Sequence, residues 1–223
     1  MAARTVFVAG AGTEIGKTYV TAALTRRLRA RGRPIRTLKP LASGVPPLGD
    51  PAFAESDTAR LLDAQDIAVD DATVEACSPW RFSAPLSPDQ AAVLEGRSLA
   101  LPDLVAWCRA QIAGTEGTLL IEGVGGLMSP VTETATGLDW LRALGVPALL
   151  VSGSYLGAIS HALTACETLR LHGVPLLAVA VSESEGAPAP PATVAASIGR
   201  HAGVPVFRLR RDEACPDALA DLI

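Results

Sequence analysis

The stretch VFVAGAGTEIGKTYV, residues 6–20, passes from an apolar run through three glycines to a lysine and a threonine. An apolar strand that enters a glycine-rich turn and then a helix aims several backbone N–H groups and a helix N-terminus at one point. The pattern therefore predicts a phosphate-binding loop at the end of a buried strand. On this stretch alone, the alternative of an ordinary tight turn that contains a lysine stays open.

The spacing of the loop departs from the usual phosphate-loop pattern. That pattern places its first glycine five residues before the second, where this chain has Ala11, and the nearest glycines are Gly10 and Gly12. In a phosphate loop, Lys17 would reach the β- and γ-phosphates and the Thr18 hydroxyl would bind Mg²⁺. We expect the whole loop to bind the nucleotide, through Gly10, Ala11, Gly12, Thr13, Glu14, Ile15, Gly16, Lys17 and Thr18.

Short apolar runs recur along the chain and are followed by turns and helical periodicity. Most runs are continuous, as in strands buried on both faces of a parallel sheet. The predicted strands are 5–9, 36–41, 118–121, 148–151, 176–181 and 204–209, and the predicted helices are 17–31, 101–113, 158–172 and 191–201. This alternation predicts one α/β domain over residues 1–223, with a mostly parallel, doubly wound sheet flanked by helices, as in P-loop NTPases.

Bulk composition narrows the class of protein. The chain has 223 residues, 49% of them hydrophobic, and a net charge of −4, which suits one large domain and makes nucleic acid an unexpected partner. No stretch is apolar enough to predict a membrane span. The four cysteines are far apart and contain no C-x-x-C pair, which favours neither disulfides nor zinc and fits a cytoplasmic location.

Lysine is rare in this chain. Of its 19 Lys+Arg residues only Lys17 and Lys39 are lysine. Because a compact ammonium and a planar guanidinium are not interchangeable in a narrow site, both lysines are candidate site residues. Lys39 lies in RTLKPLASG, where Pro40 favours an extended backbone and Ser43 follows closely.

A third motif is TLLIEG, in which Glu122 ends an apolar run. In open α/β sheets, ligands bind at the carboxyl ends of the strands. A carboxylate at that place, near a phosphate loop, predicts a ligand for the Mg²⁺ of a nucleotide. Gly123 follows it and indicates a close approach of the backbone to a ligand.

Taken in order, these motifs resemble those of the dethiobiotin synthetases, P-loop ligases of biotin synthesis. That family has a first glycine one residue further out than usual, which matches Gly10. The resemblance runs from residue 10 to about residue 180 and rests on GAGTEIGKT (10–18), KPLASG (39–44), SD (56–57), FSAPLSPD (82–89), IEGVGG (121–126) and LGAISH (156–161).

The resemblance implies a reaction in which ATP, Mg²⁺, CO₂ and 7,8-diaminononanoate yield dethiobiotin through a carbamate and a carbamic–phosphoric anhydride. It implies a homodimer with substrate bound across the interface. The catalytic residues would be Lys17, Lys39 and Thr13, and the metal ligands Thr18, Asp57 and Glu122. Substrate contacts would come from Lys39, Ser43, Gly123, Gly157, Ala158 and Ser160.

The chain departs from the family pattern at several positions. Asp89 stands where the family usually has histidine, and Ser160 where it usually has asparagine. Ser182 matches an asparagine that often contacts adenine, so we expect Ser182 at the nucleotide base. A serine hydroxyl cannot make the paired donor and acceptor contacts of an amide, which puts base specificity in doubt and leaves another nucleoside triphosphate open as co-substrate.

Two other classes compete with the ligase. A regulatory switch ATPase of the partitioning or cell-division-site type has a related fold, but carries an additional lysine early in its loop, and this loop has none before Lys17. A cobyrinate-type amidating synthetase would normally need a glutaminase domain. Both comparisons favour the ligase.

Overall fold

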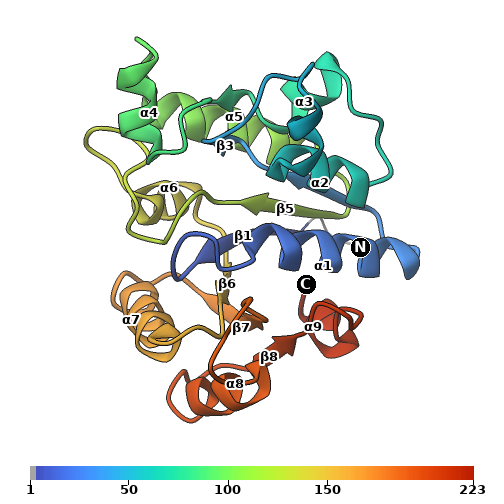
Figure 1. Cartoon of the computed structure of the whole chain (residues 1–223), viewed down its shortest axis with the longest axis vertical. Coiled ribbons are helices and arrows are strands. Elements are labelled where there is room, and N and C mark those ends of the chain that lie inside the picture. Colours follow the sequence, from blue (N-terminus) through green and yellow to red (C-terminus); the bar gives the residue numbers. More distant parts are fainter. Residues whose placement is uncertain (1–3) are drawn as a thin grey trace.

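The computed structural model describes residues 4–223, which form a six-stranded sheet covered by helices on both faces (Figure 1). The strand order is β2-β5-β1-β6-β7-β8, and every pairing between neighbours in this sheet is parallel. The strands are β1 (Arg4–Gly10), β2 (Ile35–Leu38), β5 (Thr118–Glu122), β6 (Ala148–Ser152), β7 (Leu176–Ser182) and β8 (Val206–Leu209). The predicted α/β class and parallel sheet are confirmed.

Alternation along the strands sends side chains to two separate cores. On one face, Phe7 and Ile121 pack with α5 (Leu101–Ala113), α6 (Gly137–Leu144), α7 (Ala158–Leu171) and α8 (Pro191–Gly199). On the other, Val6 and Val8 pack with α1 (Lys17–Ala30) and α9 (Asp217–Leu222). Both cores are apolar because every central strand is buried on its two faces.

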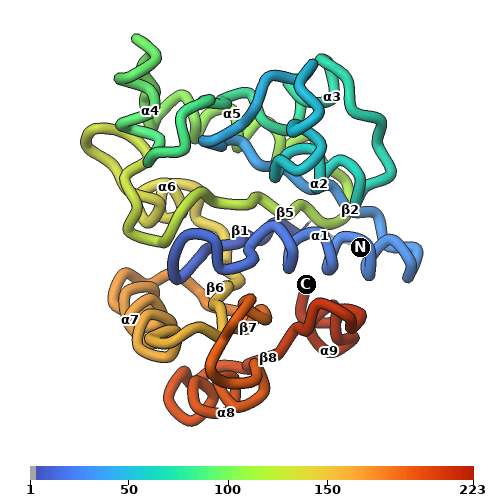
Figure 2. Tube along the Cα trace, viewed as in Figure 1, coloured from blue at the N-terminus to red at the C-terminus, as the bar shows by residue number. Residues whose placement is uncertain are grey.

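The segment between β2 and β5 builds a cap over one end of the sheet, coloured from light blue to green in Figure 2. It contains the 3₁₀ turn η1 (Pro51–Glu55), α2 (Asp57–Ala64), α3 (Asp71–Cys77) and α4 (Pro88–Leu94). Short strands β3 (Leu41–Ala42) and β4 (Trp80–Arg81) pair in a separate small sheet. The cap brings α2 against α1 and β2.

The strand predicted over 36–41 is wrong in extent. The chain leaves the main sheet after Leu38 and re-forms a strand at Leu41, in the small sheet. Pro40 lies in the break, and a proline cannot donate to a ladder of backbone hydrogen bonds. Because of this break, Lys39 belongs to neither sheet and lies just after the carboxyl end of β2.

The other predicted elements lie within two residues of the observed ones. Helices α1, α7 and α8 each end one or two residues before the predicted end, and β8 begins two residues late. Sequence analysis missed the helices of the cap, α6 and α9, whose runs are short and whose apolar periodicity is correspondingly weak. No helix among residues 4–223 is long and apolar enough to cross a membrane.

Candidate active site

The phosphate-loop segment connects the carboxyl end of β1 to the start of α1. Gly16 caps α1 with a φ of 89°, in the left-handed region that favours glycine, and no side chain caps the helix. The N–H groups of the first turn therefore face the loop without an internal partner, as an anion-binding helix N-terminus requires. A Cβ on Gly10 would lie 2.8 Å from the carbonyl oxygen of Gly125, so the loop at Gly10 has no room for a side chain.

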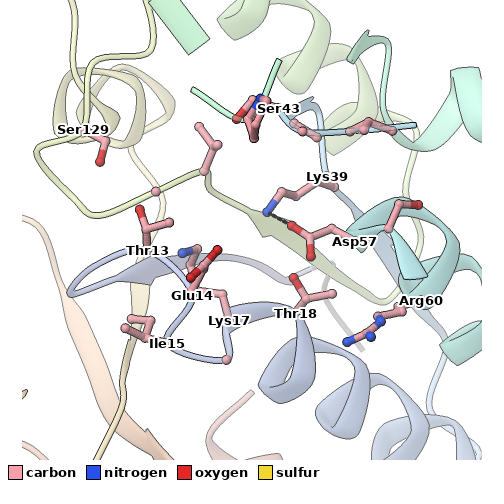
Figure 3. A pocket seen from close by; sticks show the side chains of 18 of the residues that line it. Thr13, Glu14, Ile15, Lys17, Thr18, Lys39, Ser43, Asp57, Arg60 and Ser129 are labelled. Carbon is pink, nitrogen blue, oxygen red and sulfur yellow. Dashed lines mark ion pairs between the residues drawn. The ribbon is translucent and has the colours of Figure 1, made fainter. Parts of the chain in front are cut away.

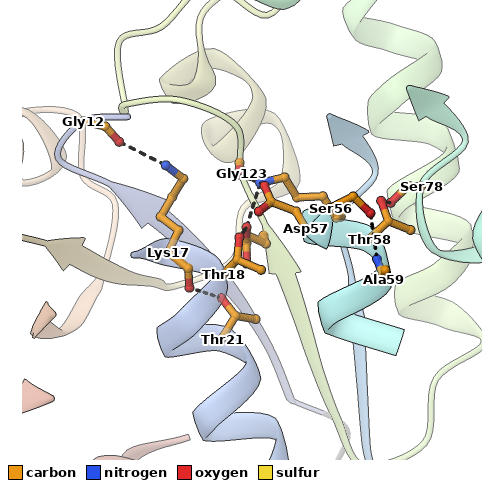
Figure 4. Close-up of polar contacts among 12 residues, drawn as sticks. Gly12, Lys17, Thr18, Thr21, Ser56, Asp57, Thr58, Ala59, Ser78 and Gly123 are labelled. Carbon is orange, nitrogen blue, oxygen red and sulfur yellow. Dashed lines mark hydrogen bonds and ion pairs between the residues drawn. The ribbon is translucent and has the colours of Figure 1, made fainter. Parts of the chain in front are cut away.

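Lys17 folds back over the loop that precedes it (Figure 4). Its Nζ donates to the carbonyl oxygen of Gly12 at 3.0 Å, and the side chain is buried. Burial, and then repulsion by the nearby Lys39 ammonium, lower the pKa of Lys17 to about 8. A buried ammonium with no carboxylate partner is a strong site for a phosphate oxygen, because the anion would supply the missing countercharge.

Lys39 lies at the centre of a buried ionic cluster. Its Nζ is 2.8 Å from Asp57 Oδ2 and 2.7 Å from Glu122 Oε1, and it also donates to the carbonyl oxygen of Gly123 at 3.1 Å. The Thr18 hydroxyl donates to the same Glu122 oxygen at 2.6 Å. Four segments far apart in sequence thus meet at the carboxyl edge of the sheet.

Lys39 and Asp57 hold each other in their ionised forms. Burial alone would lower the pKa of Lys39, but Asp57 and Glu122 outweigh burial and raise it above its usual range. Burial alone would raise the pKa of Asp57, but the Lys39 ammonium lowers it to about 2. The cluster therefore presents fixed charges at neutral pH, which a site for charge-dense phosphates needs.

The oxygens of the cluster fit a magnesium site. Glu122 is fully buried, and its Oε2 has no hydrogen-bond partner among residues 4–223. An unpartnered buried carboxylate oxygen is costly unless a cation or donor completes it. No set of three His, Cys, Asp or Glu residues gathers within this part of the chain. Mg²⁺, however, often takes one or two carboxylates and completes its shell with phosphates and waters.

A cleft of about 560 Å³ opens above these groups (Figure 3). It brings together the predicted Thr13, Lys17, Lys39, Ser43 and Asp57. Several other residues line the same cleft and were not predicted as site residues. Ser56, Ser87, Val124 and Gly125 lie within the quoted family motifs, whereas Tyr19, Glu55, Arg60, Ser129 and Arg211 lie outside them. Of these, Ser129 accepts a hydrogen bond from the Gly126 N–H at 2.8 Å and so shapes the loop after β5.

The predicted substrate contacts at the start of α7 lie outside the cleft. Gly157, Ala158 and Ser160 lie at the start of α7, beyond the residues that line it. Gly157 caps that helix with a φ of 98°, and Ser160 is exposed. The single chain does not bring the predicted substrate contacts of α7 to the phosphate loop.

Ser182 is buried at the end of β7, directly behind the phosphate loop. A Cβ on Gly16 would come within 2.4 Å of Ser182 Oγ, and this oxygen has no hydrogen-bond partner in the described part of the chain. Asp89 lies in the first turn of α4, and its Oδ1 likewise lacks a partner among residues 4–223.

Comparison with known proteins identifies the family. The family model described as an AAA domain matches residues 4–208. The ATP-dependent dethiobiotin synthetase BioD of Methylobacterium nodulans is 67% identical over 221 residues, which cover 98% of each chain. The chain belongs to the dethiobiotin synthetase family.

Other dethiobiotin synthetases match nearly as completely. The dethiobiotin synthetase of Caulobacter sp. is 47% identical, and the match covers 97% of this chain and 92% of the relative. The enzyme of Acidiphilium cryptum is 46% identical, and the match covers 90% of this chain and 91% of the relative. These identities extend over most of each chain, so the resemblance seen in the sequence is confirmed.

Solved structures show how widely this fold is shared. A ParA family ATPase from Chlorobium tepidum superposes with a TM-score of 0.54 at 15% identity, over 99% of this chain and 89% of its own. The septum site-determining protein MinD of Pyrococcus horikoshii, complexed with Mg-ADP, superposes with a TM-score of 0.53 at 17% identity. The match covers 100% of this chain and 87% of the MinD chain. At this level of identity, these likenesses show the fold alone.

Proposed function

We propose that this chain converts 7,8-diaminononanoate, CO₂ and ATP into dethiobiotin, ADP and phosphate. The observation that supports it best is the pair of lysines. Lys17 and Lys39 are the only lysines of the chain, both are buried, and both line the cleft at the N-terminus of α1. The family membership and the phosphate loop support ATP as the phosphoryl donor.

The proposed reaction has three steps. One substrate amine adds to CO₂ and loses a proton, which gives a carbamate. A carbamate oxygen attacks the γ-phosphorus of ATP, the bond to the β-phosphate oxygen breaks, and ADP and a carbamic–phosphoric anhydride result. The second amine attacks the carbamoyl carbon, phosphate leaves, and the five-membered urea ring closes. None of these steps needs a protein nucleophile, so catalysis rests on position and charge.

Lys17 and Lys39 supply positive charge where negative charge accumulates. Lys17 already lies over the loop, 3.0 Å from the Gly12 carbonyl oxygen, and would exchange that contact for the β- and γ-phosphates. Lys39 would hold the carbamate against the transferred phosphoryl group. Thr13 and Ser43, which line the same cleft, would orient phosphate and carbamate oxygens through their hydroxyls.

Thr18, Asp57 and Glu122 would hold Mg²⁺. Glu122 offers its Oε2, which has no hydrogen-bond partner among residues 4–223. Asp57 pairs with Lys39, and the Thr18 hydroxyl donates to the other oxygen of Glu122. Bound there, Mg²⁺ would neutralise charge on the β- and γ-phosphates. Gly123 would contribute its backbone, since its carbonyl oxygen already faces Lys39.

We infer a homodimer in which the partner chain supplies the missing end of the substrate site. Gly157, Ala158 and Ser160 lie outside the cleft of their own chain, and Leu156 beside them is 88% exposed. The uncapped N–H groups at the start of α7 suit a carboxylate. A mass measurement of the active enzyme tests this, and an active monomer contradicts it.

We further infer that residues 1–223 act as one domain and that the enzyme works in the cytoplasm. Both cores share the strands of one sheet, and all four cysteines are buried and free, as suits a reducing compartment.

The direct test is to incubate the enzyme with diaminononanoate, bicarbonate, Mg²⁺ and ATP. We expect dethiobiotin by mass, together with one phosphate for each molecule formed. Hydrolysis of ATP that does not depend on diaminononanoate, with no dethiobiotin, would instead favour a switch ATPase.

A further inference from the structure

Arg211 is a cleft residue to which the proposed reaction assigns no role. It follows β8, and it is the only residue beyond Ser129 that lines the cleft. The catalytic cluster comes from residues 10–129. Arg211 instead follows β8, the edge strand of the main sheet that lies furthest from β2. Its side chain is exposed to the open space of the cleft.

Several contacts hold Arg211 in place. Its backbone N–H donates to Glu183 Oε2 at 2.9 Å, and its Nε donates to the Glu183 carbonyl oxygen at 3.2 Å. Its guanidinium carbon lies 4.5 Å from the ring centroid of Tyr19, whose hydroxyl donates to the Arg210 carbonyl oxygen at 2.6 Å. The guanidinium is therefore seated on an aromatic ring before any ligand arrives.

Tyr19 places Arg211 close to the phosphate loop, because Tyr19 lies in the first turn of α1. Tyr19 is the third residue of α1, two positions after Lys17, and a guanidinium nitrogen of Arg211 lies 3.7 Å from the Cβ position of Gly16. Lys17 and Lys39 gather at the γ-phosphate end of the cleft. A triphosphate bound with its γ-phosphate at these lysines and running across the N-terminus of α1 would place its nucleoside toward Arg211, which lines the same cleft.

The residues around Arg211 offer little to the edge of a base. Ser182 Oγ is fully buried and lies against Gly16, and Glu183 already accepts from the Arg211 backbone. A guanidinium can instead contact the face of a base. Arg is suited to this, because its planar, delocalised group stacks on aromatic surfaces, and every base has such a face.

We propose that Arg211 stacks on the base of the bound nucleotide and holds its nucleoside half without discriminating between bases. The proposal rests on the proposed function in one respect, that a nucleoside triphosphate occupies the cleft. It assigns a role in nucleotide affinity to a residue that lies outside the motifs quoted for the family.

Binding measurements test this on the whole protein without turnover. Dissociation constants of ATP, CTP, GTP and inorganic tripolyphosphate are measured by calorimetry, with Mg²⁺, for wild type and Arg211→Ala. We expect all three nucleotides to weaken by a common factor of about ten or more. Tripolyphosphate, which has no base, should change by less than about threefold.

Two further variants sharpen the result. Arg208→Ala removes the same charge from an exposed side chain on β8 that pairs with Glu213 and does not line the cleft, so it should leave all four constants unchanged. Arg211→Lys keeps the charge but loses the planar group, so it should resemble Arg211→Ala. Because Arg211 is exposed, we expect both of its variants to unfold at the wild-type temperature.

Four results would overturn the proposal: unchanged nucleotide affinity in Arg211→Ala, a loss confined to one base, an equal loss for tripolyphosphate, or full recovery in Arg211→Lys. A wild-type protein that binds none of the three nucleotides would contradict the proposed function itself, which separates the two failures.

Discussion

The two ends of the cleft are built differently. At the phosphate end, Lys17, Lys39 and Glu122 are buried, and Lys39 has two carboxylates within 2.8 Å. At the end where we propose the nucleoside binds, Ser182 is buried with no hydrogen-bond partner among residues 4–223, and Arg211 is exposed. Chemistry on the γ-phosphate needs charges fixed in advance, whereas a nucleoside that only anchors the substrate needs no such precision. We therefore expect substitutions at the first end to affect turnover and those at the second to affect affinity.

The largest effect should come from the two lysines. Lys17→Ala and Lys39→Ala should each lower kcat by on the order of 10²–10³, because each removes a preorganised charge at the transferred phosphoryl group. Lys39→Arg should also be poor, since a planar fork does not fit between two carboxylates and a carbonyl shaped around an ammonium.

Steady-state kinetics on protein shown to be folded by thermal unfolding checks this. Arg26→Ala is the matched control, because it removes a charge from the surface of α1, where Arg26 pairs with Asp63. Near-wild-type activity of Lys39→Arg would show that this end of the cleft does not require lysine.

A smaller effect is expected at the metal. Asp57→Asn removes one charged ligand, while Lys39 keeps its contact with Glu122. The Mg²⁺ concentration for half-maximal activity should rise about 10–100-fold. Asp63→Asn on the same helix, where the carboxylate is 74% exposed, should leave it unchanged. Equal Mg²⁺ dependence in the two variants would remove Asp57 from the metal site.

Discrimination between nucleotides should be weak. With no amide at Ser182 to pair with the edge of adenine, kcat/KM for ATP, CTP and GTP should differ by no more than about 1–3 kcal/mol in transition-state free energy. Parallel kinetics with the three nucleotides decides this. A preference for ATP beyond roughly 10³-fold would mean that the nucleoside end contains groups that read the base after all.

The smallest effect is expected for Ser182→Ala without nucleotide. The variant removes a buried hydroxyl that has no partner among residues 4–223, so the free energy of unfolding should stay constant or rise by up to about 1 kcal/mol. Denaturant unfolding measures it. A loss of more than about 1 kcal/mol would reveal a partner for Ser182 within the folded chain.

Local patterns allowed much of the fold to be predicted. Continuous apolar runs identified all six strands of the main sheet, since strands buried on both faces need such runs whatever their neighbours are. Helix α5 matched its prediction at both ends, while the short helices of the cap escaped. A helix of seven or eight residues shows too few turns for its periodicity to stand out, and tertiary packing supplies its stability.

The candidate site divides in the same way. Lys17 and Thr18 follow from the loop itself, and Lys39 and Glu122 from motifs at strand ends. Asp57 was predicted only through the family resemblance. Arg211 could not be predicted, because its importance comes from Tyr19, 192 positions earlier in the chain, and from Glu183. No local pattern records which side chain will lie across a cleft.

The sequence by itself determined the chemistry of this protein: a phosphate loop, two lysines and the ordered motifs of one family, each of which depends on residues close together in the chain. The tertiary structure decided the rest. It broke the predicted strand at Pro40 so that Lys39 could reach Glu122, and it placed Arg211 on Tyr19. It also left Glu122 Oε2 without a hydrogen-bond partner among residues 4–223. These contacts depend on how the strands order themselves in the sheet, and that order is set by packing across the whole domain, to which every strand and helix contributes.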